Sequence, residues 1–358
     1  MSSTKSDIQP VSNESPIRTV LVGCGEHARV VIHAALSLIE DIEVVAACDL
    51  DQERARDASR RFGNCPHYSD LEVMLSETDA QAAVIVGPPH VHTSIAVTCL
   101  QAGLHIFVEK PLFTSLEDLN RISVLAAEKP GLNISVSFNK RYAPYICQTR
   151  EILNSDSFGM PSYLYAKFAG GYRNGSTDLL RVGAIHYFDL ARHLFGDITR
   201  VSALPYEKQA GQAHIAVNLQ FASGAIGNFF LSSLGLWSAK GAEYLEIRGD
   251  RNFITLDNLR ELTWQKPPLS IRNSGSSHQA GIELPAPAEY LEPNYSNISL
   301  LEYQSNYQNG YFTRIKTFVT DLRSGQQSGP GLKDAEHAFK TALAIEESIA
   351  ANGTYVEL

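Results

Sequence analysis

The sequence has few cysteines, no excess of positive charge and no long uncharged apolar run. Its 358 residues include 30 Lys and Arg against 39 Asp and Glu, which gives a formal net charge of -9. A chain with this balance presents no overall positive field that would attract nucleic acid or an anionic membrane. The absence of a run of about 18 uncharged apolar residues argues against a membrane-spanning helix.

The cysteines are scattered, and the first residues do not form a signal peptide. The five cysteines are Cys24, Cys48, Cys65, Cys99 and Cys147. An odd set without metal-ligand spacing fits reduced thiols better than a disulfide framework. Residues 1–16 are rich in Ser, Asn and Pro and lack an apolar centre, so we expect a disordered leader and a cytoplasmic location. The composition, 44% hydrophobic and 19% charged, is that of a globular protein, and the length favours two domains.

The first half of the chain alternates apolar runs with helical patterns. We expect strands at 17–22, 42–48, 82–86, 106–108 and 132–138. Strands that alternate with helices specify a doubly wound parallel sheet, here an α/β Rossmann domain over residues 17–140. Chemically distinctive loops follow four of these strands. Crossovers of one hand would bring all four loops to the same edge of the sheet.

The turn after the first strand reads Gly23-Cys24-Gly25-Glu26-His27-Ala28, a G-x-G-x-x-A pattern. Gly23 would make the tight turn, Gly25 would let a pyrophosphate approach the backbone, and Ala28 would allow close helix–strand packing. The following helix N-terminus offers free N–H groups to phosphates. Its place between a strand and a helix favours a dinucleotide site over an ordinary glycine turn.

Asp49 ends the second strand, near the distance from the glycine turn at which an acid binds the 2′-hydroxyl of the adenosine ribose. Its charge would repel a 2′-phosphate, so we expect NAD rather than NADP. The alternative is a plain turn residue, because Asp is common at strand ends.

The stretch from His105 to Pro111 joins a buried strand to a carboxylate, an ammonium and a proline. Pro111 removes a backbone donor, so the strand cannot continue through it. Charged groups at the carboxyl end of a parallel strand lie where open α/β sheets bind ligands. A partly desolvated Lys110 could take part in proton transfer there. The alternative is that Glu109 and Lys110 are solvated residues that open a loop.

The second half predicts an α+β domain over residues 141–358 with a large open, mainly antiparallel sheet. Short alternating runs predict strands at 163–168, 214–221, 225–231, 244–248 and 253–257. Helical patterns cover 145–153, 178–195, 311–322 and 332–350. The segment 267–297 is dense in Ser, Pro and Asn and is expected to be a long loop. We find no internal repeat.

Three polar residues share one face of the helix expected at 178–195. His186, Asp189 and His193 fall at i, i+3 and i+7. Such a stripe is usually a solvated helix side, so spacing alone does not identify His186 as a catalytic base. Asp189 could hold a substrate hydroxyl or pair with Arg192 or Arg181.

Together these motifs resemble the Gfo/Idh/MocA family, the group of glucose–fructose oxidoreductase and inositol dehydrogenase. The most specific marks are the glycine turn, Pro88-Pro89-His90-Val91-His92, Glu109-Lys110-Pro111, Asn139-Lys140-Arg141-Tyr142-Ala143-Pro144 and His186-Tyr187-Phe188-Asp189-Leu190. The resemblance covers the chain after residue 16. It implies an NAD-dependent oxidoreductase that acts on the CH-OH group of a sugar, nucleotide sugar or cyclitol. It also implies a homodimer or homotetramer whose open sheets cover each other's strand edges.

The resemblance implies roles for individual residues. Lys110 would be the active-site lysine and His186 the general acid/base, together managing the hydroxyl proton. The cofactor-binding residues would be Gly23, Gly25, Glu26, His27, Ala28, Asp49, Leu50, Pro88, Pro89, His92, Glu109, Lys110 and Asn139. The substrate-binding residues would be Lys110, Tyr142, Arg173, His186, Asp189 and Tyr311, of which Tyr142, Arg173 and Tyr311 could equally pack or face water. No metal is implied. Many family members carry an aspartate four residues before this histidine, whereas this chain has Val182.

Two other functions share these motifs. Some relatives recycle the bound nicotinamide in place, as NAD-dependent glycosidases or aldose–ketose oxidoreductases. A non-catalytic NAD(P)-binding sensor also uses this fold, but it has no need of Lys110 and His186, both of which are present here.

Overall fold

The computed structural model describes residues 11–12, 15–171, 175–209, 211–236, 239–266, 289–291 and 306–358. Within this part, the chain divides into two compact units. The first comprises residues 1–143 and 298–339, and the second comprises residues 144–297 and 340–358. The first boundary lies close to the division expected at residue 140. The segment 298–339 belongs to the first unit, although it falls within the expected second domain.

The first unit contains a six-stranded parallel sheet. Its strands are β1 (Ile17–Val22), β2 (Ile42–Cys48), β3 (His67–Tyr68), β4 (Ala82–Ile85), β5 (His105–Val108) and β6 (Ile134–Val136). They lie in the order β3-β2-β1-β4-β5-β6, and every neighbouring pair is parallel. This confirms the doubly wound sheet. The order reverses between β1 and β4, where such sheets open a crevice at the carboxyl ends of their strands.

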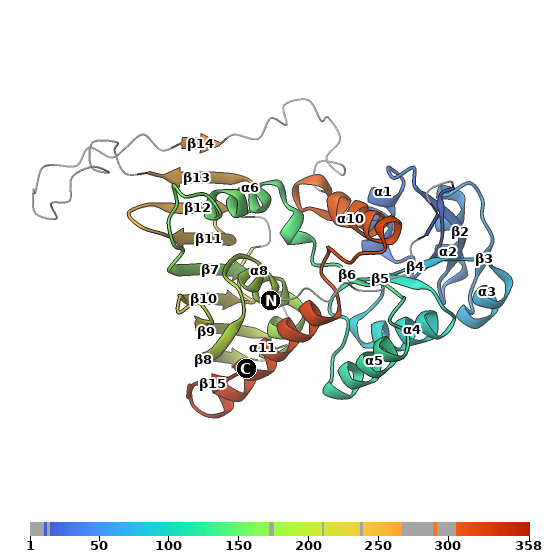
Figure 1. Ribbon diagram of the computed structural model, residues 1–358. Coiled ribbons are helices and arrows are strands. Elements are labelled where there is room, and N and C mark those ends of the chain that lie inside the picture. Colours follow the sequence, from blue (N-terminus) through green and yellow to red (C-terminus); the bar gives the residue numbers. More distant parts are fainter. Residues whose placement is uncertain are drawn as a thin grey trace, which may run out of the picture. The chain divides into compact units, whose positions relative to one another are not determined.

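Helices cover both faces of this sheet. They are the π-helix η1 (Ala28–Ile32), α1 (His33–Leu36), α2 (Gln52–Arg61), α3 (Leu71–Glu77), α4 (Pro89–Gln101), α5 (Leu116–Glu128), the 3-10 helix η2 (Asn139–Tyr142) and α10 (Tyr311–Ser324). α4 and α5 lie on one face, and α1 and α10 on the other (Figure 1). The second of these layers is a continuous apolar core in which Leu21 of β1 and Phe107 of β5 meet Ile32 and Phe318. α10 therefore belongs to this unit because its apolar side completes the core.

The second unit contains a nine-stranded sheet in its described part. Its strands are β7 (Tyr163–Ala169), β8 (Ile198–Gln209), β9 (Gln212–Phe221), β10 (Ile226–Ser232), β11 (Glu243–Arg248), β12 (Phe253–Asp257), β13 (Glu261–Gln265), β14 (Glu289–Leu291) and β15 (Val356–Glu357). Their order is β14-β13-β12-β11-β7-β10-β9-β8-β15. Neighbours are antiparallel except for β7 and β10, which run parallel. This confirms the mainly antiparallel sheet.

One face of this sheet packs against helices. The helices of this unit are α6 (Pro144–Leu153), α7 (Ser176–Asp178), the π-helix η3 (Leu179–Gly183), α8 (Ile185–Phe195) and the part of α11 (Leu332–Ala350) that follows residue 339. Phe188 and Phe195 of α8 stack on Phe229 and Phe221 of the sheet, with ring centroids 6.3 and 5.0 Å apart. None of the helices in the described part of the chain combines the length and hydrophobicity that crossing a membrane requires.

Candidate active site

The glycine turn leaves β1 through a position that only glycine can occupy. Gly23 has φ +89°, and a Cβ there would lie 1.8 Å from the Val86 carbonyl oxygen. At Gly25, by contrast, no atom lies within 4 Å of the position that a Cβ would take. The backbone is therefore open on that side, where the helix N-terminus directs its N–H groups. This cradle fits a pyrophosphate.

Asp49 lies directly against the glycine turn. Its Oδ2 accepts a hydrogen bond from the Cys24 N–H at 2.7 Å, and its Oδ1 accepts from the Asp51 N–H at 2.9 Å. The carboxylate thus joins the carboxyl ends of β1 and β2. Leu50, the next residue, is almost fully exposed.

A pocket of about 280 Å³ opens beside the glycine turn. It is lined by Cys24, Gly25, Glu26, Arg29, His33, Arg54, Asp57, Ala58 and Arg61. Asp57 pairs with Arg60 at 3.0 Å, and Arg54 pairs with Asp51 at 3.3 Å. The pocket carries three arginines against two carboxylates. The sequence alone does not identify these arginines as neighbours, because they lie on two helices, η1 and α2, that only the fold brings together.

A buried carboxylate joins the glycine turn to the end of β5. Glu109 Oε1 lies 3.7 Å from His27 Nε2, and Glu109 Oε2 accepts the Lys110 N–H at 3.2 Å. Burial by itself would raise the pKa of Glu109, but its interactions with His27 and the charge of Lys110 outweigh burial and hold that pKa below its usual value. The carboxylate is therefore charged at neutral pH, immediately beside half-buried Lys110.

Lys110 follows a residue whose backbone is hydrogen-bonded to the neighbouring strand β4. The Glu109 N–H donates to the Ile85 carbonyl of β4 at 2.9 Å. The peptide bond between Lys110 and Pro111 is cis.

His92 is buried with both ring nitrogens engaged. Nδ1 lies 2.8 Å from the Pro111 carbonyl oxygen, and Nε2 accepts the Gly87 N–H at 3.1 Å. Burial lowers the pKa of His92, which keeps the ring neutral. Pro88 precedes α4 as its N-cap, and Pro89 occupies the first position of that helix.

The start of α10 lies beside the glycine turn and η2. The Tyr311 ring meets the His27 ring edge-on with centroids 6.0 Å apart. Asn139 is buried, and its side-chain Nδ2 donates to the Asn309 carbonyl at 2.7 Å. A Cβ at Gly310 would lie 2.3 Å from the Asn139 carbonyl oxygen, so this close approach requires glycine. The structure therefore brings Tyr311 and Asn139 together with the predicted cofactor residues.

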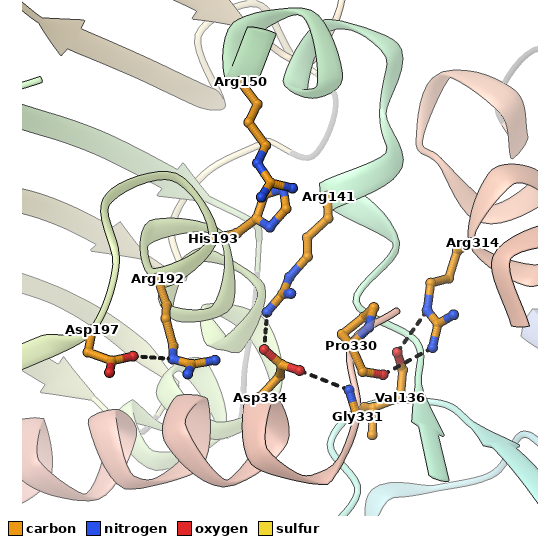
Figure 2. A network of polar contacts seen from close by, with 10 residues as sticks. All are labelled: Val136, Arg141, Arg150, Arg192, His193, Asp197, Arg314, Pro330, Gly331 and Asp334. Carbon is orange, nitrogen blue, oxygen red and sulfur yellow. Dashed lines mark hydrogen bonds and ion pairs between the residues drawn. The ribbon is translucent and has the colours of Figure 1, made fainter. Parts of the chain in front are cut away.

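Tyr142 belongs to the packed interior of the first unit. The Arg314 guanidinium lies 5.7 Å from the Tyr142 ring centroid, and it donates to the carbonyls of Val136 and Pro330 at 3.1 Å each (Figure 2). Burial raises the pKa of Tyr142. This environment favours the packing alternative for Tyr142.

Figure 2 also shows a polar cluster that fixes the start of α11. Arg141 donates to Asp334 at 2.8 Å, and the second oxygen of Asp334 accepts the Gly331 N–H at 2.9 Å. Both partners are largely buried, with side chains 11% and 18% exposed.

In the second unit, His186 and Asp189 are buried on α8. They are 7% and 2% exposed, so the stripe they share is not a solvated helix side. Their helix directly follows the π-helix η3, which contains Val182, and π segments often occur at functional sites. Buried titratable side chains of this kind are candidates for a functional role.

The other predicted polar residues on and around α8 have partners within the second unit. Arg192 pairs with Asp197 at 2.6 Å, and Arg181 donates to Glu346 at 2.9 Å. His193 Nε2 lies 3.4 Å from a guanidinium nitrogen of Arg150 (Figure 2). Arg173 lies outside the described residues, as does most of the loop expected at 267–297. Within the described part, no cluster of three or more His, Cys, Asp or Glu side chains is arranged to hold a metal ion.

Two family models match the chain. Residues 17–138 match a model described as an oxidoreductase family with an NAD-binding Rossmann fold. Residues 170–358 match the model of the oxidoreductase family's C-terminal alpha/beta domain.

Individual relatives match along nearly the whole length. Myo-inositol 2-dehydrogenase of Thermotoga maritima is 23% identical over 340 residues, which covers 89% of this chain and 92% of that protein. The crystal structure of a dehydrogenase from Chromobacterium violaceum has a TM-score of 0.82 at 22% identity, covering 94% and 96% of the two chains. The WlbA dehydrogenase from Bordetella pertussis, solved in complex with NADH and UDP-GlcNAcA, has a TM-score of 0.74 at 20% identity, covering 98% and 99%. At these identities the solved structures show a shared fold.

Proposed function

The chain belongs to the Gfo/Idh/MocA family of NAD-binding oxidoreductases, and we propose that it interconverts a hydroxyl and a ketone on a sugar, cyclitol or nucleotide sugar. One relative is named myo-inositol 2-dehydrogenase, and one solved neighbour holds UDP-GlcNAcA, a nucleotide sugar. Both names describe those proteins and support the substrate class proposed here.

The cofactor residues proposed for this chain line the carboxyl edge of the first sheet. The open backbone at Gly25 would receive the pyrophosphate, with Glu26, His27 and Ala28 providing the helix N-terminus. Asp49 and Leu50 would meet the adenosine ribose, because Asp49 is held against the turn. Further along the edge, the residues proposed to line the cofactor groove are Pro88, Pro89, His92, Glu109, Lys110 and Asn139. When bound, NAD supplies the hydride chemistry, and the protein supplies orientation and proton management.

Lys110 would act as a cation that stabilises the developing oxyanion. Its buried neighbour Glu109 has a lowered pKa, held down by interactions with His27 and by the charge of Lys110. A positive group preorganised near growing negative charge lowers the barrier for the chemical step. This juxtaposition of charged Glu109 and Lys110 beside the glycine turn is the observation that carries the proposal.

His186 would accept the hydroxyl proton in the oxidative direction. Its buried position on α8 keeps bulk water from competing for that proton, and Asp189 lies one turn further on the same helix. Asp189 and Tyr311 are proposed as substrate contacts, while Tyr142 and Arg173 remain weaker proposals. Because Val182 replaces the usual aspartate, the substrate contacts of other members do not transfer directly.

The test is absorbance of reduced nicotinamide with purified protein, NAD or NADP, and a panel of inositols, free sugars and nucleotide sugars. We expect net reduction of NAD with one substrate class. Lys110→Ala should reduce kcat by about 100-fold or more, because one transition-state charge contact contributes roughly 3–4 kcal/mol. It should still bind NAD in a calorimeter.

The matched control is Lys333→Ala, which alters an exposed lysine of the same unit and should leave turnover unchanged. Full activity of Lys110→Ala would refute the assignment. NAD binding without net reduction by any panel member would favour a recycled-cofactor enzyme instead.

We further propose that the chain forms a homodimer or homotetramer through the sheet face opposite α8. Exposed apolar side chains gather on strands of that sheet, including Ile226 at 53%, Leu204 at 62% and Tyr206 at 58% exposure. Ile226 lies beside Tyr163 in the ladder, so the apolar surface crosses strands. Exposed apolar surface of this kind marks interaction sites.

Analytical ultracentrifugation would test this assembly. We expect Ile226→Asp to dissociate the oligomer, since it would bury a charge in the contact. Met160→Asp, at a 78% exposed position outside the strands, is the matched control. A monomeric wild-type protein would contradict the proposal.

A cytoplasmic location is proposed from the cysteines. None of the five forms a disulfide, and burial raises the pKa of Cys24 and Cys99 to about 12. Reduced, protonated thiols suit a reducing compartment. Recovery of the native protein in a secreted fraction would count against it.

A further inference from the structure

The first turn of α4 ties together two loops at the carboxyl edge of the first sheet. The buried His92 ring is 1% exposed and bridges the Gly87 N–H and the Pro111 carbonyl. The Gly87 N–H can only donate, so Nε2 must be the unprotonated nitrogen. Nδ1 then carries the proton and donates it to Pro111. Neutral histidine is the only protonation state that satisfies both partners.

The two partners of His92 belong to different parts of the proposed site. Gly87 begins the loop that continues through Pro88 and Pro89 after β4, whereas Pro111 directly follows Lys110 after β5. Thr93, the neighbour of His92 on α4, donates from Oγ1 to the Leu112 carbonyl at 2.9 Å. Two consecutive carbonyls after Lys110 are therefore held by one helical turn.

The Lys110 backbone is consequently fixed from both sides. The Glu109 N–H is bound to Ile85 of β4, and the Pro111 carbonyl is bound to His92. A lysine has a long flexible side chain, so the placement of its ammonium depends on how firmly its backbone is held.

We propose that His92 is a positioning residue with two separable duties, rather than a direct contact of the cofactor. Its Nδ1–H places Lys110 through Pro111, and its Nε2 places the Gly87–Pro89 loop against NAD. Both ring nitrogens are already bonded within the protein, which leaves neither for a ligand. This inference rests on the proposed roles of Lys110 and of the Gly87–Pro89 loop.

Two isosteric substitutions separate the duties. In His92→Asn the amide nitrogen takes the place of Nδ1 and keeps the donor to Pro111, while the acceptor for Gly87 is lost. In His92→Gln the amide oxygen reaches the place of Nε2 and keeps that acceptor, while the donor to Pro111 is lost. Each variant therefore retains one of the two bonds.

The readouts are the NAD dissociation constant by calorimetry and the ¹³C resonance of reductively methylated Lys110, assigned with Lys110→Ala. We expect His92→Asn to raise the NAD dissociation constant about tenfold, which corresponds to the net contribution of one hydrogen bond. The Lys110 resonance should stay unchanged. We expect His92→Gln to shift the Lys110 resonance and keep NAD affinity. Its kcat on the panel substrate should fall roughly 10- to 100-fold, as expected for a misplaced catalytic group.

The matched control is the same pair of substitutions at His90, an exposed histidine on the same helix, which should move neither readout. If both His92 variants alter both readouts in equal proportion with a matching loss of thermal stability, His92 only stabilises the fold and the proposal is refuted. Wild-type behaviour of both variants also refutes it. Failure of the proposed function is distinguishable, because it would appear as full activity of Lys110→Ala, while NAD affinity and the Lys110 resonance still report on His92.

Discussion

Asp49 carries a charge at the point where the glycine turn meets a pocket rich in arginine. Its carboxylate accepts hydrogen bonds from the backbone N–H groups of Cys24 and Asp51. The adjacent pocket is lined by Arg29, Arg54 and Arg61, among other residues. A 2′-phosphate at this edge would be repelled by Asp49 and attracted by the arginines. We therefore expect the preference for NAD over NADP to depend on the Asp49 side chain.

We predict that Asp49→Ser reduces the NAD-over-NADP preference by about 10- to 100-fold, because removing one close repulsive charge changes relative affinity by roughly 1.4–2.7 kcal/mol. Calorimetric dissociation constants for both cofactors would measure it. Asp57→Ser is the control: Asp57 lines the same pocket, but its charge is paired with Arg60. An unchanged preference in Asp49→Ser would show that selectivity lies elsewhere.

For individual residues, the sequence predicts the roles that depend only on neighbouring residues in the chain. Gly23 and Gly25 sit in a turn between a strand and a helix, and Lys110 ends a strand, so their shared edge follows from strand order alone. The pairing of His27 with Glu109 joins residues far apart in the chain, and so does the arginine pocket. The burial of His186 depends on what packs over α8, which helical periodicity does not report.

The helices and strands also divide into those that local sequence predicts and those that depend on contacts between distant parts of the chain. Helices with local signals are predictable from the sequence: α6 and α11 cover nearly the residues expected at 145–153 and 332–350. A capping side chain is such a local signal, as at α5, where Ser115 accepts the Asp118 N–H. β8 is not predicted from the sequence because its second half, which includes Pro205, is exposed at every position and so lacks a regular alternation of buried apolar and exposed polar residues. The parallel pairing of β7 with β10 is non-local and leaves no sequence pattern.

Among the elements, α10 is attached to the first sheet by a fully buried arginine. Arg314 donates to Val136 and Pro330, and its guanidinium lies 5.2 Å from the Phe107 ring centroid. We predict that Arg314→Met lowers the free energy of unfolding by about 2–4 kcal/mol, because two buried hydrogen bonds from a charged donor are lost, although each carbonyl keeps a backbone N–H donor. Urea denaturation followed by circular dichroism would measure the change.

Lys316→Met is the matched control, since Lys316 is exposed on the same helix and its loss should cost less than about 0.5 kcal/mol. Equal stability of Arg314→Met and wild type would mean that methionine packing replaces the lost bonds, as happens at some buried ionic sites.

At the scale of the whole molecule, Lys110 and the proposed cofactor residues belong to the first unit. Conditions that unfold the first unit should therefore abolish turnover. The first unit is the more acid-sensitive candidate, because burial lowers the pKa of both His33 and His105 to about 4.

The direction of the pH effect follows from proton binding. In the unfolded chain these histidines bind protons below about pH 6.5, whereas in the folded unit they stay neutral until about pH 4. Between these values the unfolded state binds more protons, so stability is full above pH 6.5 and falls as the pH is lowered. Each histidine should cost about 2 kcal/mol at pH 5.

Urea denaturation at pH 7.5 and pH 5 would measure this loss, with His33→Gln compared against His67→Gln. His33 is buried, so its replacement should remove about half of the effect ascribed to the two histidines, even if it also lowers stability at both pH values. His67 is exposed, and its replacement should leave the pH dependence as in the wild type. If His33→Gln kept the full pH dependence, the loss of stability at pH 5 would have to arise from other groups. Glu109 cannot supply it, because a carboxyl whose folded pKa lies below its usual value loses its stabilising charge only below about pH 4.5. Further acidification below that range would protonate the carboxylate beside Lys110, so there we expect loss of turnover to accompany loss of stability.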